Sequence, residues 1–268
     1  MIVYHYCNAF NALAILKERR LRLTDVYRMN DAKEARYLYT LYLEELKKYG
    51  NNEFMDEFYD FALSHNYHFY TNYLKGNSGR YAGCFSVEVD LTSQWIAYGD
   101  NGMGYAIGIE DEYFKELEDS FQYHQIEYYG PDTIKEHVIQ LYKKYKDKIE
   151  KHPRSTEVLE SILLEIKNYN IDSCLIKSFH FKSEKEKRLV YEGKGTSYQS
   201  EHFHIDHRDY YAKQNYINSY LGLYFTPKIV KEVIIGPKNR NEIEDIKELL
   251  VDLGYNDVRV SKSNSGYI

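Results

Sequence analysis

The sequence predicts an α+β fold, and three observations support this prediction. Short runs of β-branched and aromatic residues, which are typical of strands, are scattered along the 268 residues. Stretches with helical spacing lie between them, without the regular strand–helix alternation of a parallel sheet. Only four prolines occur, and no Ser/Gly-rich tract marks a linker. We therefore expect a single domain over residues 1–268, with helical insertions at about 32–75 and 111–170.

The N-terminal segment is predicted to form a strand, a helix and a second strand. Ile2–Tyr6 consists of β-branched and aromatic residues, which favour a strand. Asn8 is a suitable N-cap for a helix that continues to Arg20. Leu21 and Leu23 then alternate with polar neighbours, a pattern that indicates a half-buried strand.

The longer helices are expected in the two insertions. Asn30 and Asp31 are better suited to capping a helix than to contacting a substrate. Apolar residues at helical spacing then favour helices over 38–46 and about 53–73. A third helical block is predicted from Asp132 to Tyr169, with a break at Pro153.

Two further groups of strands are predicted around these insertions. The first is a strand over about Tyr81–Phe85, a short helix in LTSQWIAYGD that Gly99 closes, and a strand in GYAIGIE. The second begins with two strand-like halves of CLIKSFHFKSEKEKRLVYEG around a charged centre. KEVIIG and VRVSKS are then predicted as strands that flank a helix capped by Asn241 and ended by Gly254.

Composition narrows the class of protein. The net charge of −6 argues against non-specific nucleic-acid binding, which needs a basic surface. Cys7, Cys84 and Cys174 lie far apart, so neither a disulfide framework nor a zinc signature is present. Without a signal peptide or an apolar run long enough to cross a bilayer, the expected location is the cytoplasm.

Side chains with useful chemistry recur at the predicted strand ends. His5 lies in the first strand, Ser86 ends the third, and Trp95 and Tyr98 follow on the short helix. Glu184 and Glu186 precede the strand RLVY. Each also has an ordinary interpretation: a core histidine, a helix core stripe, and a solvated charged run. Two residues apart on a strand, both glutamates would share one face, and either could point inward.

This order resembles the ADP-ribosyltransferase superfamily, in the His-Tyr-Glu branch that includes diphtheria toxin and the poly-ADP-ribose polymerases. The resemblance implies a split β-sheet core with helical insertions, NAD as substrate and no metal. It implies that His5 orients the NAD ribose, that Trp95 and Tyr98 surround the nicotinamide, and that Glu186 stabilises an oxocarbenium-like ribose. The expected catalytic residues are Glu186, His5 and Tyr98, and the expected NAD contacts are His5, Tyr6, Ser86, Trp95, Tyr98, Lys177 and Arg188.

The implied chemistry is physically reasonable. Cleavage of the bond between nicotinamide and ribose places positive charge on the ribose, and a fixed carboxylate stabilises that charge in the transition state. An aromatic ring would hold the nicotinamide for departure. Arg188 is equally suited to a diphosphate contact and to a structural ion pair.

A second resemblance covers nearly the whole chain. The segments YHYC, LRLTDVYRMNDAKE, CFS, QWIAYGDNGMGYAIGI, KS with EKEKRLV, and IIGP are similar to an uncharacterised bacterial family, number 2971 among the domains of unknown function. Cys7 stands where that family usually has Thr, and Lys187 where it usually has Trp. That family has no assigned activity, so this second resemblance groups the chain with similar proteins and implies no reaction.

Several functions therefore remain open. The leading expectation is an NAD-dependent ADP-ribosyltransferase or NAD glycohydrolase. Bacterial relatives of that superfamily often act as toxins or phage-defence effectors, which would imply a protein or nucleic-acid acceptor and an antitoxin or defence-system partner, with no membrane partner. One alternative is a non-catalytic module on the same fold that senses nucleotides or binds proteins. Another is a metal-dependent nuclease at His202, His204 and His207, with Asp209 nearby.

Overall fold

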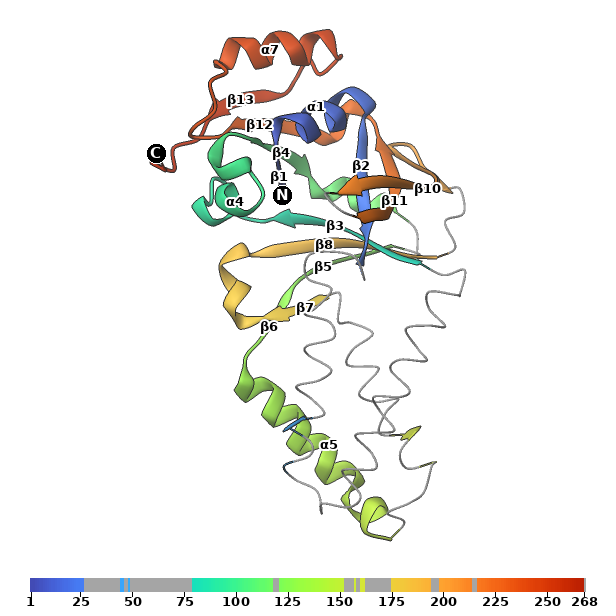
Figure 1. Ribbon diagram of the computed structural model, residues 1–268. Coiled ribbons are helices and arrows are strands. Elements are labelled where there is room, and N and C mark those ends of the chain that lie inside the picture. The colour runs from blue at the N-terminus through green and yellow to red at the C-terminus, as the bar shows by residue number, and fades with distance from the viewer. Residues whose placement is uncertain are drawn as a thin grey trace. The chain divides into compact units, whose positions relative to one another are not determined.

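The computed structural model describes residues 1–26, 44–45, 48, 79–117, 121–151, 157, 160–161, 175–193, 198–213 and 216–267 (Figure 1). The chain divides into two compact units. One, here called the sheet unit, comprises Met1–Asp25, Gly79–Ile126 and Ser183–Ile268. The other, the inserted unit, comprises Val26–Ser78 and Glu127–Lys182, which overlap the two expected insertions. The helices expected over 38–46, 53–73 and beyond Pro153, with Asn30, Asp31 and Cys174, lie largely outside the described residues.

The sheet unit is built on an eleven-stranded mixed sheet within the described residues, and this confirms the α+β class. The strands are β1 (Ile2–Cys7), β2 (Arg20–Asp25), β3 (Gly79–Ser86), β4 (Tyr105–Glu110), β5 (Phe121–Gln125), β8 (Glu186–Gly193), β9 (Tyr198–Gln199), β10 (Phe203–Lys213), β11 (Tyr216–Phe225), β12 (Val230–Ile235) and β13 (Arg259–Lys262). Their order is β13-β12-β4-β1-β3-β2-β11-β10-β9, with β8 paired to β3 and β5.

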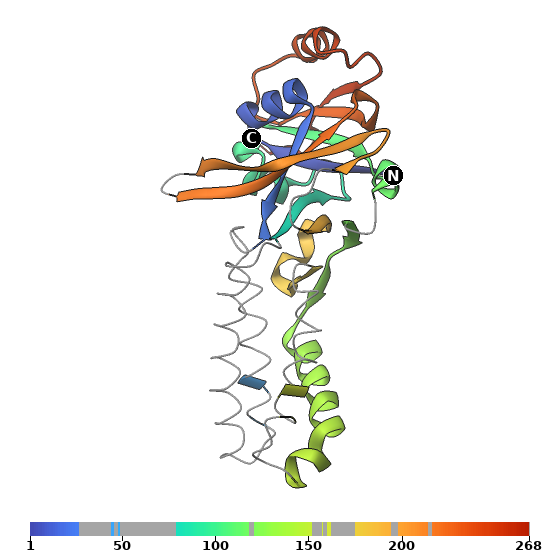
Figure 2. The same cartoon turned by 90° about the vertical axis from the view of Figure 1, so that its right-hand side faces the viewer.

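The sheet branches at β3. This strand pairs with β8 along its whole length, with β1 at Ser86, and with β2 at Tyr81 and Ala82. Because three strands share it, β3 brings the ends of β1 and β8 next to one another. Figure 2 shows the β10–β11 hairpin extending past the other strands of this unit.

Short helices connect these strands. They are α1 (Ala9–Glu18), α4 (Thr92–Ala97) and α7 (Ile243–Asp252), with 3-10 helices η2 (Asp100–Gly102), η3 (Asp111–Glu116), η5 (Phe179–Glu184) and η6 (Pro227–Ile229). The side chain of Asn8 accepts a hydrogen bond from Asn11 N and caps α1, as predicted. The N-cap of α7 is Glu242 rather than the expected Asn241, and Asp245 accepts from its backbone N–H.

Two hydrophobic clusters lie on the two faces of β1, because successive side chains of a strand alternate. Val3 and Cys7 join the large cluster that also contains Phe85, Leu189 and the inner residues of β2, β11 and α7. Tyr4 and Tyr6 join the small cluster of Trp95, Ala106 and Ile234. This parity decides which side chains of β1 reach the candidate site.

The described part of the inserted unit contains β6 (Glu127–Tyr129), β7 (Ile176–Ser178) and α5 (Pro131–Lys151). β6 and β7 form a parallel pair. On α5, Ile134, Val138 and Tyr145 are buried, so apolar side chains at helical spacing lie on one face of this helix. Ahead of α5, the described residues 111–117 and 121–129 contain η3, β5 and β6, so they are not α-helical although they lie within the expected 111–170 insertion. No described helix combines the length and the apolar character needed to cross a membrane.

Candidate functional site

Ser86 and Glu186 lie side by side on one face of the sheet unit. Antiparallel pairing places Tyr4 opposite Ser86, and Ser86 opposite Glu186. Directly opposed residues of an antiparallel pair point to the same face. Since Tyr4 belongs to the small cluster with Trp95, the face that carries Ser86 and Glu186 is the face that α4 covers.

His5 points to the opposite face. Its ring packs on Phe85 with centroids 5.9 Å apart, and its Nδ1 lies 3.0 Å from the carbonyl oxygen of Cys84. A carbonyl oxygen only accepts, so Nδ1 carries the proton in this arrangement. Loss of solvation lowers the pKa of His5, and the hydrogen bond to Cys84 partly offsets that effect. The structure therefore does not bring the side chains of His5 and Glu186 together.

Trp95 and Tyr6 form the buried support of this face. The indole of Trp95 is fully buried, and its Nε1 donates to Asp90 Oδ1 at 2.7 Å. The ring of Tyr6 meets the indole edge to face, with centroids 4.8 Å apart. The hydroxyl of Tyr6 accepts a hydrogen bond from Leu91 N at 3.2 Å, and burial raises the pKa of Tyr6 to about 12. Trp95 and Tyr6 thus anchor α4 to the sheet. The indole of Trp95 has no exposed surface on which a ligand could stack.

Glu186 forms a buried ion pair with Arg188. The Nε of Arg188 lies 2.5 Å from Oε1, and its Nη2 lies 3.3 Å from Oε2. The two side chains are 3% and 6% exposed, so little water screens the pair. Of the two interpretations of Arg188, the structure shows the ion pair. The carboxylate of Glu186 is accordingly engaged on both oxygens.

Glu184, in contrast to Glu186, lies next to the end of α4. It ends η5, and its Oε1 lies 3.3 Å from the hydroxyl of Tyr98, which follows α4. Tyr98 is 39% exposed, whereas Glu184 is 9% exposed. A solvent-accessible aromatic ring therefore stands next to a shielded carboxylate, and both come from segments that meet only through the tertiary fold.

Ser86 and Gln94 hold the backbone of Glu184. The hydroxyl of Ser86 donates to the carbonyl of Glu184 at 3.0 Å, and Gln94 Nε2 donates to the same oxygen at 3.5 Å. Val87 N donates to the carbonyl of Lys185 at 3.0 Å. Ser86 is 3% exposed, so its hydroxyl positions Glu184 from inside the fold. Gln94 is a site residue that the sequence interpretation missed, because its amide acts on a distant backbone atom.

Four non-glycine residues near Tyr98 and Glu184 have left-handed backbone conformations. Lys185 has φ 45°, Asp90 has φ 60°, and consecutive residues Asp100 and Asn101 have φ 51° and 55°. Non-glycine residues adopt positive φ rarely and at a cost, and such residues are concentrated at functional sites. Their clustering here, next to Tyr98 and Glu184, supports this end of the sheet as the candidate site.

Lys177 lies in the inserted unit, on β7. It is 1% exposed, and its Nζ lies 5.1 Å from the ring centroid of Phe181. Lys177 therefore belongs to a different unit from Tyr98 and Glu184. Its expected contact with NAD stays a prediction.

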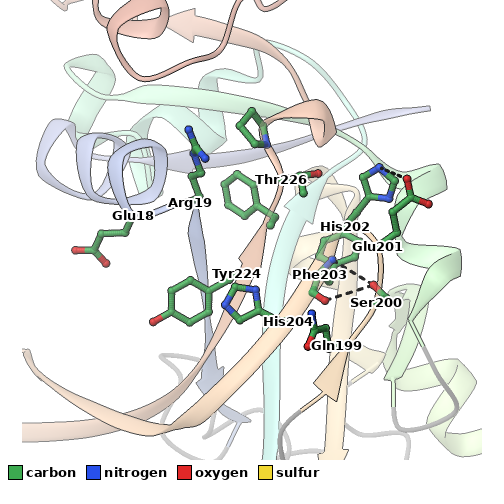
Figure 3. A pocket seen from close by; sticks show the side chains of 12 residues that line it. Glu18, Arg19, Gln199, Ser200, Glu201, His202, Phe203, His204, Tyr224 and Thr226 are labelled. Carbon is green, nitrogen blue, oxygen red and sulfur yellow. Dashed lines mark hydrogen bonds and ion pairs between the residues drawn. The ribbon is translucent and has the colours of Figure 1, made fainter.

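The three histidines that the sequence offers as metal ligands have different surroundings in the structure. His202 Nδ1 lies 2.9 Å from Glu116 Oε2. The ring of His204 stacks on the ring of Tyr224 (Figure 3). The side chain of His207 is 90% exposed. In the part of the chain that the structure describes, no three His, Cys, Asp or Glu side chains are grouped so as to hold a metal ion. The nuclease alternative therefore gains no support.

Comparison with known proteins gives one match. No curated protein and no solved structure matches the chain. Residues 94–189, from Gln94 on α4 to Leu189 on β8, match the model of a family described as "Protein of unknown function (DUF2971)". The matched stretch includes Gln94, Trp95, Tyr98, Glu184, Glu186 and Arg188. This part of the chain is thus similar to the DUF2971 family.

Proposed function

We propose that this protein is an NAD-consuming enzyme, either an ADP-ribosyltransferase or an NAD glycohydrolase, that acts at Tyr98 and Glu184. One observation carries the proposal: the partly exposed ring of Tyr98 lies with its hydroxyl 3.3 Å from the carboxylate of Glu184. Together they offer a stacking surface and a fixed negative charge within the reach of one small ligand.

The proposed reaction needs these two features. Nicotinamide would stack on Tyr98, and its ring nitrogen would take the electron pair of the N-glycosidic bond as that bond breaks. The ribose carbon would acquire positive charge and would then bond to an acceptor nucleophile or to water. A shielded carboxylate next to that carbon lowers the energy of the transition state more than that of bound NAD.

The choice between the two glutamates follows from their partners. Arg188 neutralises Glu186, which makes Glu186 a weak stabiliser of a second positive charge. The carboxylate of Glu184 lies beside the partly exposed ring of Tyr98, whose hydroxyl donates a hydrogen bond to it. The proposal therefore assigns Glu184 the role that the resemblance gave to Glu186, and it leaves Glu186–Arg188 a supporting role. Contact between NAD ribose and His5 would need a ligand on the opposite face.

One observation favours the non-catalytic alternative. If Glu186 is the residue that corresponds to the glutamate of the superfamily, its ion pair with Arg188 would suit a module that senses nucleotides without turnover. Turnover by the wild-type protein separates the two functions. A toxin or phage-defence role belongs to the enzyme proposal and depends on it.

The test is incubation of the purified protein with NAD and quantification of released nicotinamide by chromatography. We expect Glu184→Gln to lower the rate at least about 100-fold, in the range found when one transition-state contact is removed. Tyr98→Ala should lower it as well, mainly through weaker NAD binding. Matched controls are Glu192→Gln, an exposed carboxylate on β8, and Tyr210→Ala, an exposed ring on β10.

The outcomes separate the hypotheses. If Glu186→Gln abolishes release and Glu184→Gln does not, the assignment returns to Glu186. If NAD binds by calorimetry but no nicotinamide appears with any acceptor, the sensing module is favoured. Absence of both binding and release contradicts NAD chemistry altogether.

A further inference from the structure

A pocket of about 320 Å³ opens in the sheet unit, away from Tyr98 and Glu184 (Figure 3). It lies between the end of α1, the connection from β9 to β10, and the end of β11. Phe203 and Phe225, which are paired across β10 and β11, contribute apolar surface. A volume of this order accommodates a small organic molecule.

The stacked rings of His204 and Tyr224 form one wall, and the guanidinium of Arg20 lies behind them. His204 and Tyr224 are cross-strand partners, and their rings stack at 4.5 Å with 7° between the planes. The guanidinium of Arg20 lies over the ring of Tyr224, with Cζ 5.6 Å from its centroid. His204 is exposed, and its partner on the other side, in β9, is Gln199 at the edge of the pocket. An exposed ring favours contact with a further planar ring, as in the stacking of bases on aromatic side chains.

Thr226, which lines the pocket, carries a buried hydroxyl without a partner among the described residues. Its Oγ1 makes no hydrogen bond to any residue that the structure describes. A buried polar atom without a partner costs stability, and a ligand that binds it removes that cost. The hydroxyl both donates and accepts, so it suits a heteroaromatic ring edge or a sugar hydroxyl.

The rim is held rigidly. Glu116 binds His202 Nδ1 at 2.9 Å, and the ring of Tyr113 packs on His202 with centroids 4.7 Å apart. Ser200 Oγ accepts a hydrogen bond from Phe203 N at 3.2 Å, which closes the turn into β10. A pre-formed wall reduces the ordering cost of binding.

The charges at the pocket are mixed. Glu18 and Glu201 contribute carboxylates, and Arg19 contributes a guanidinium that donates to the carbonyl of Leu253. Glu18 also pairs with Arg20. This balance gives no preference for a polyanion such as a triphosphate, whereas carboxylates accept hydrogen bonds from sugar hydroxyls and amino groups.

From these features we propose that the pocket binds a neutral nucleoside, with its base stacked on His204 and a polar group hydrogen-bonded to Thr226. The nucleoside site is separate from the NAD chemistry proposed above and does not rest on it. It would give the protein a second small-molecule site on the same sheet.

The test is calorimetric titration of the full chain with adenosine, guanosine, cytidine and uridine, and with adenosine 5′-monophosphate. We expect saturable binding of at least one nucleoside. His204→Ala should weaken that binding about tenfold, the scale of one stacked base. The matched control His207→Ala removes an exposed histidine of the same strand outside the pocket and should bind as wild type.

Thr226→Val gives the sharpest readout because its two effects have opposite signs. Loss of the unpartnered hydroxyl should raise the melting temperature of the free protein while it weakens nucleoside binding about fivefold. A purely structural threonine would lose stability or leave affinity unchanged.

Three results would overturn the proposal: no saturable binding of any nucleoside at millimolar concentration, wild-type affinity in His204→Ala, or much tighter binding of the monophosphate than of adenosine. Unchanged nicotinamide release in His204→Ala, with nucleoside binding lost, would show that this pocket and the site at Tyr98 are independent.

Discussion

The hydroxyl of Tyr98 lies 3.3 Å from Oε1 of Glu184, although the two residues are 86 positions apart in the chain. The branching of the sheet at β3 explains this proximity. β3 leads through Ser86 towards α4, and β8 begins opposite Ser86, so the residues just before β8 meet the end of α4. The site thus depends on pairings between strands that are distant in sequence.

The ion pair of Glu186 with Arg188 should contribute to stability. Glu186→Gln leaves Arg188 buried beside a weakened partner, and we expect a loss of about 2 kcal/mol in unfolding free energy, below the ~3–5 kcal/mol for complete removal of a buried partner. Glu192→Gln, on the same strand as Glu186, weakens an exposed ion pair with Arg80 and should cost less than about 1 kcal/mol. Urea denaturation followed by circular dichroism measures both. Equal losses in the two variants would contradict the assignment of Glu186 to a buried structural ion pair.

Ser86 should act as a positioning residue for Glu184. Ser86→Ala removes the donor to the Glu184 carbonyl and should cost about 1 kcal/mol of stability. Under the proposed function, it should also lower the turnover of NAD more than it lowers NAD affinity.

Ser219→Ala is the matched control for Ser86→Ala. Ser219 is a buried serine on β11 whose hydroxyl lies 3.3 Å from Asp25 Oδ2, away from Tyr98. It should show a similar stability loss with wild-type turnover. Reduced turnover in both variants, in proportion to their stability, would remove the positioning role.

The elements with strong local patterns could be predicted from the sequence. β1, α1 and β2 follow from alternation, helical spacing and the Asn8 cap, all of which are short-range. The cap of α7 could not, because Asn241 Oδ1 accepts a hydrogen bond from the Tyr105 hydroxyl at 2.5 Å. The tertiary contact with Tyr105 occupies the side chain that the capping preference of Asn would direct to the N-terminus of α7.

The geometry of the candidate site depends on backbone conformations that the sequence pattern does not reveal. A strand through both glutamates would put them on one face, but Lys185 has φ 45° and separates η5 from β8. Glu184 and Glu186 therefore have different partners. His5 was grouped with Glu186, yet the register of β1 with β3 puts it on the face of Phe85. Register and positive φ are set by tertiary structure, and a single sequence does not display them.

Gly104 should be among the least replaceable residues. A Cβ at this position would lie 2.1 Å from the carbonyl oxygen of Cys7 and 2.9 Å from the carbonyl of Gly99. Both neighbours are backbone atoms of β1 and the loop before β4, so no side chain can move aside. We expect Gly104→Ala to cost more than about 3 kcal/mol or to prevent folding.

Gly83→Ala is a suitable comparison for Gly104→Ala. Its Cβ would meet Leu23 Cδ2 at 2.8 Å, the end of a side chain that can adopt another rotamer. It should therefore cost less, and thermal denaturation of the two variants gives the ranking. A well-folded Gly104→Ala protein with wild-type stability would show that the packing of β1 on the Gly99–Gly104 loop is looser than described.

Asp111 should make stability depend on pH. Its carboxylate accepts from the Met1 ammonium at 2.7 Å, from Lys187 Nζ at 2.9 Å and from the Tyr123 hydroxyl at 3.1 Å. Burial acts to raise the pKa of Asp111, but the hydrogen bonds and charges of the ammonium and Lys187 outweigh it and hold that pKa below its ordinary value. A carboxyl group with a lowered folded-state pKa stabilises the fold above the unfolded-state pKa, and this contribution is lost as the pH falls through the folded-state pKa.

Asp111→Asn should therefore be less stable than wild type by about 2 kcal/mol near neutral pH, the scale of hydrogen bonds to a charged group. The difference should shrink once the pH falls below about 4, where the unfolded-state carboxyl becomes protonated, and approach its minimum at still lower pH. Denaturation free energies measured from neutral to acid pH test this, with Asp257→Asn as an exposed control for the loss of one charge. A difference that stayed constant down to the acid limit would mean that packing, and not the charge of Asp111, stabilises the contact of η3 with Met1 and β8.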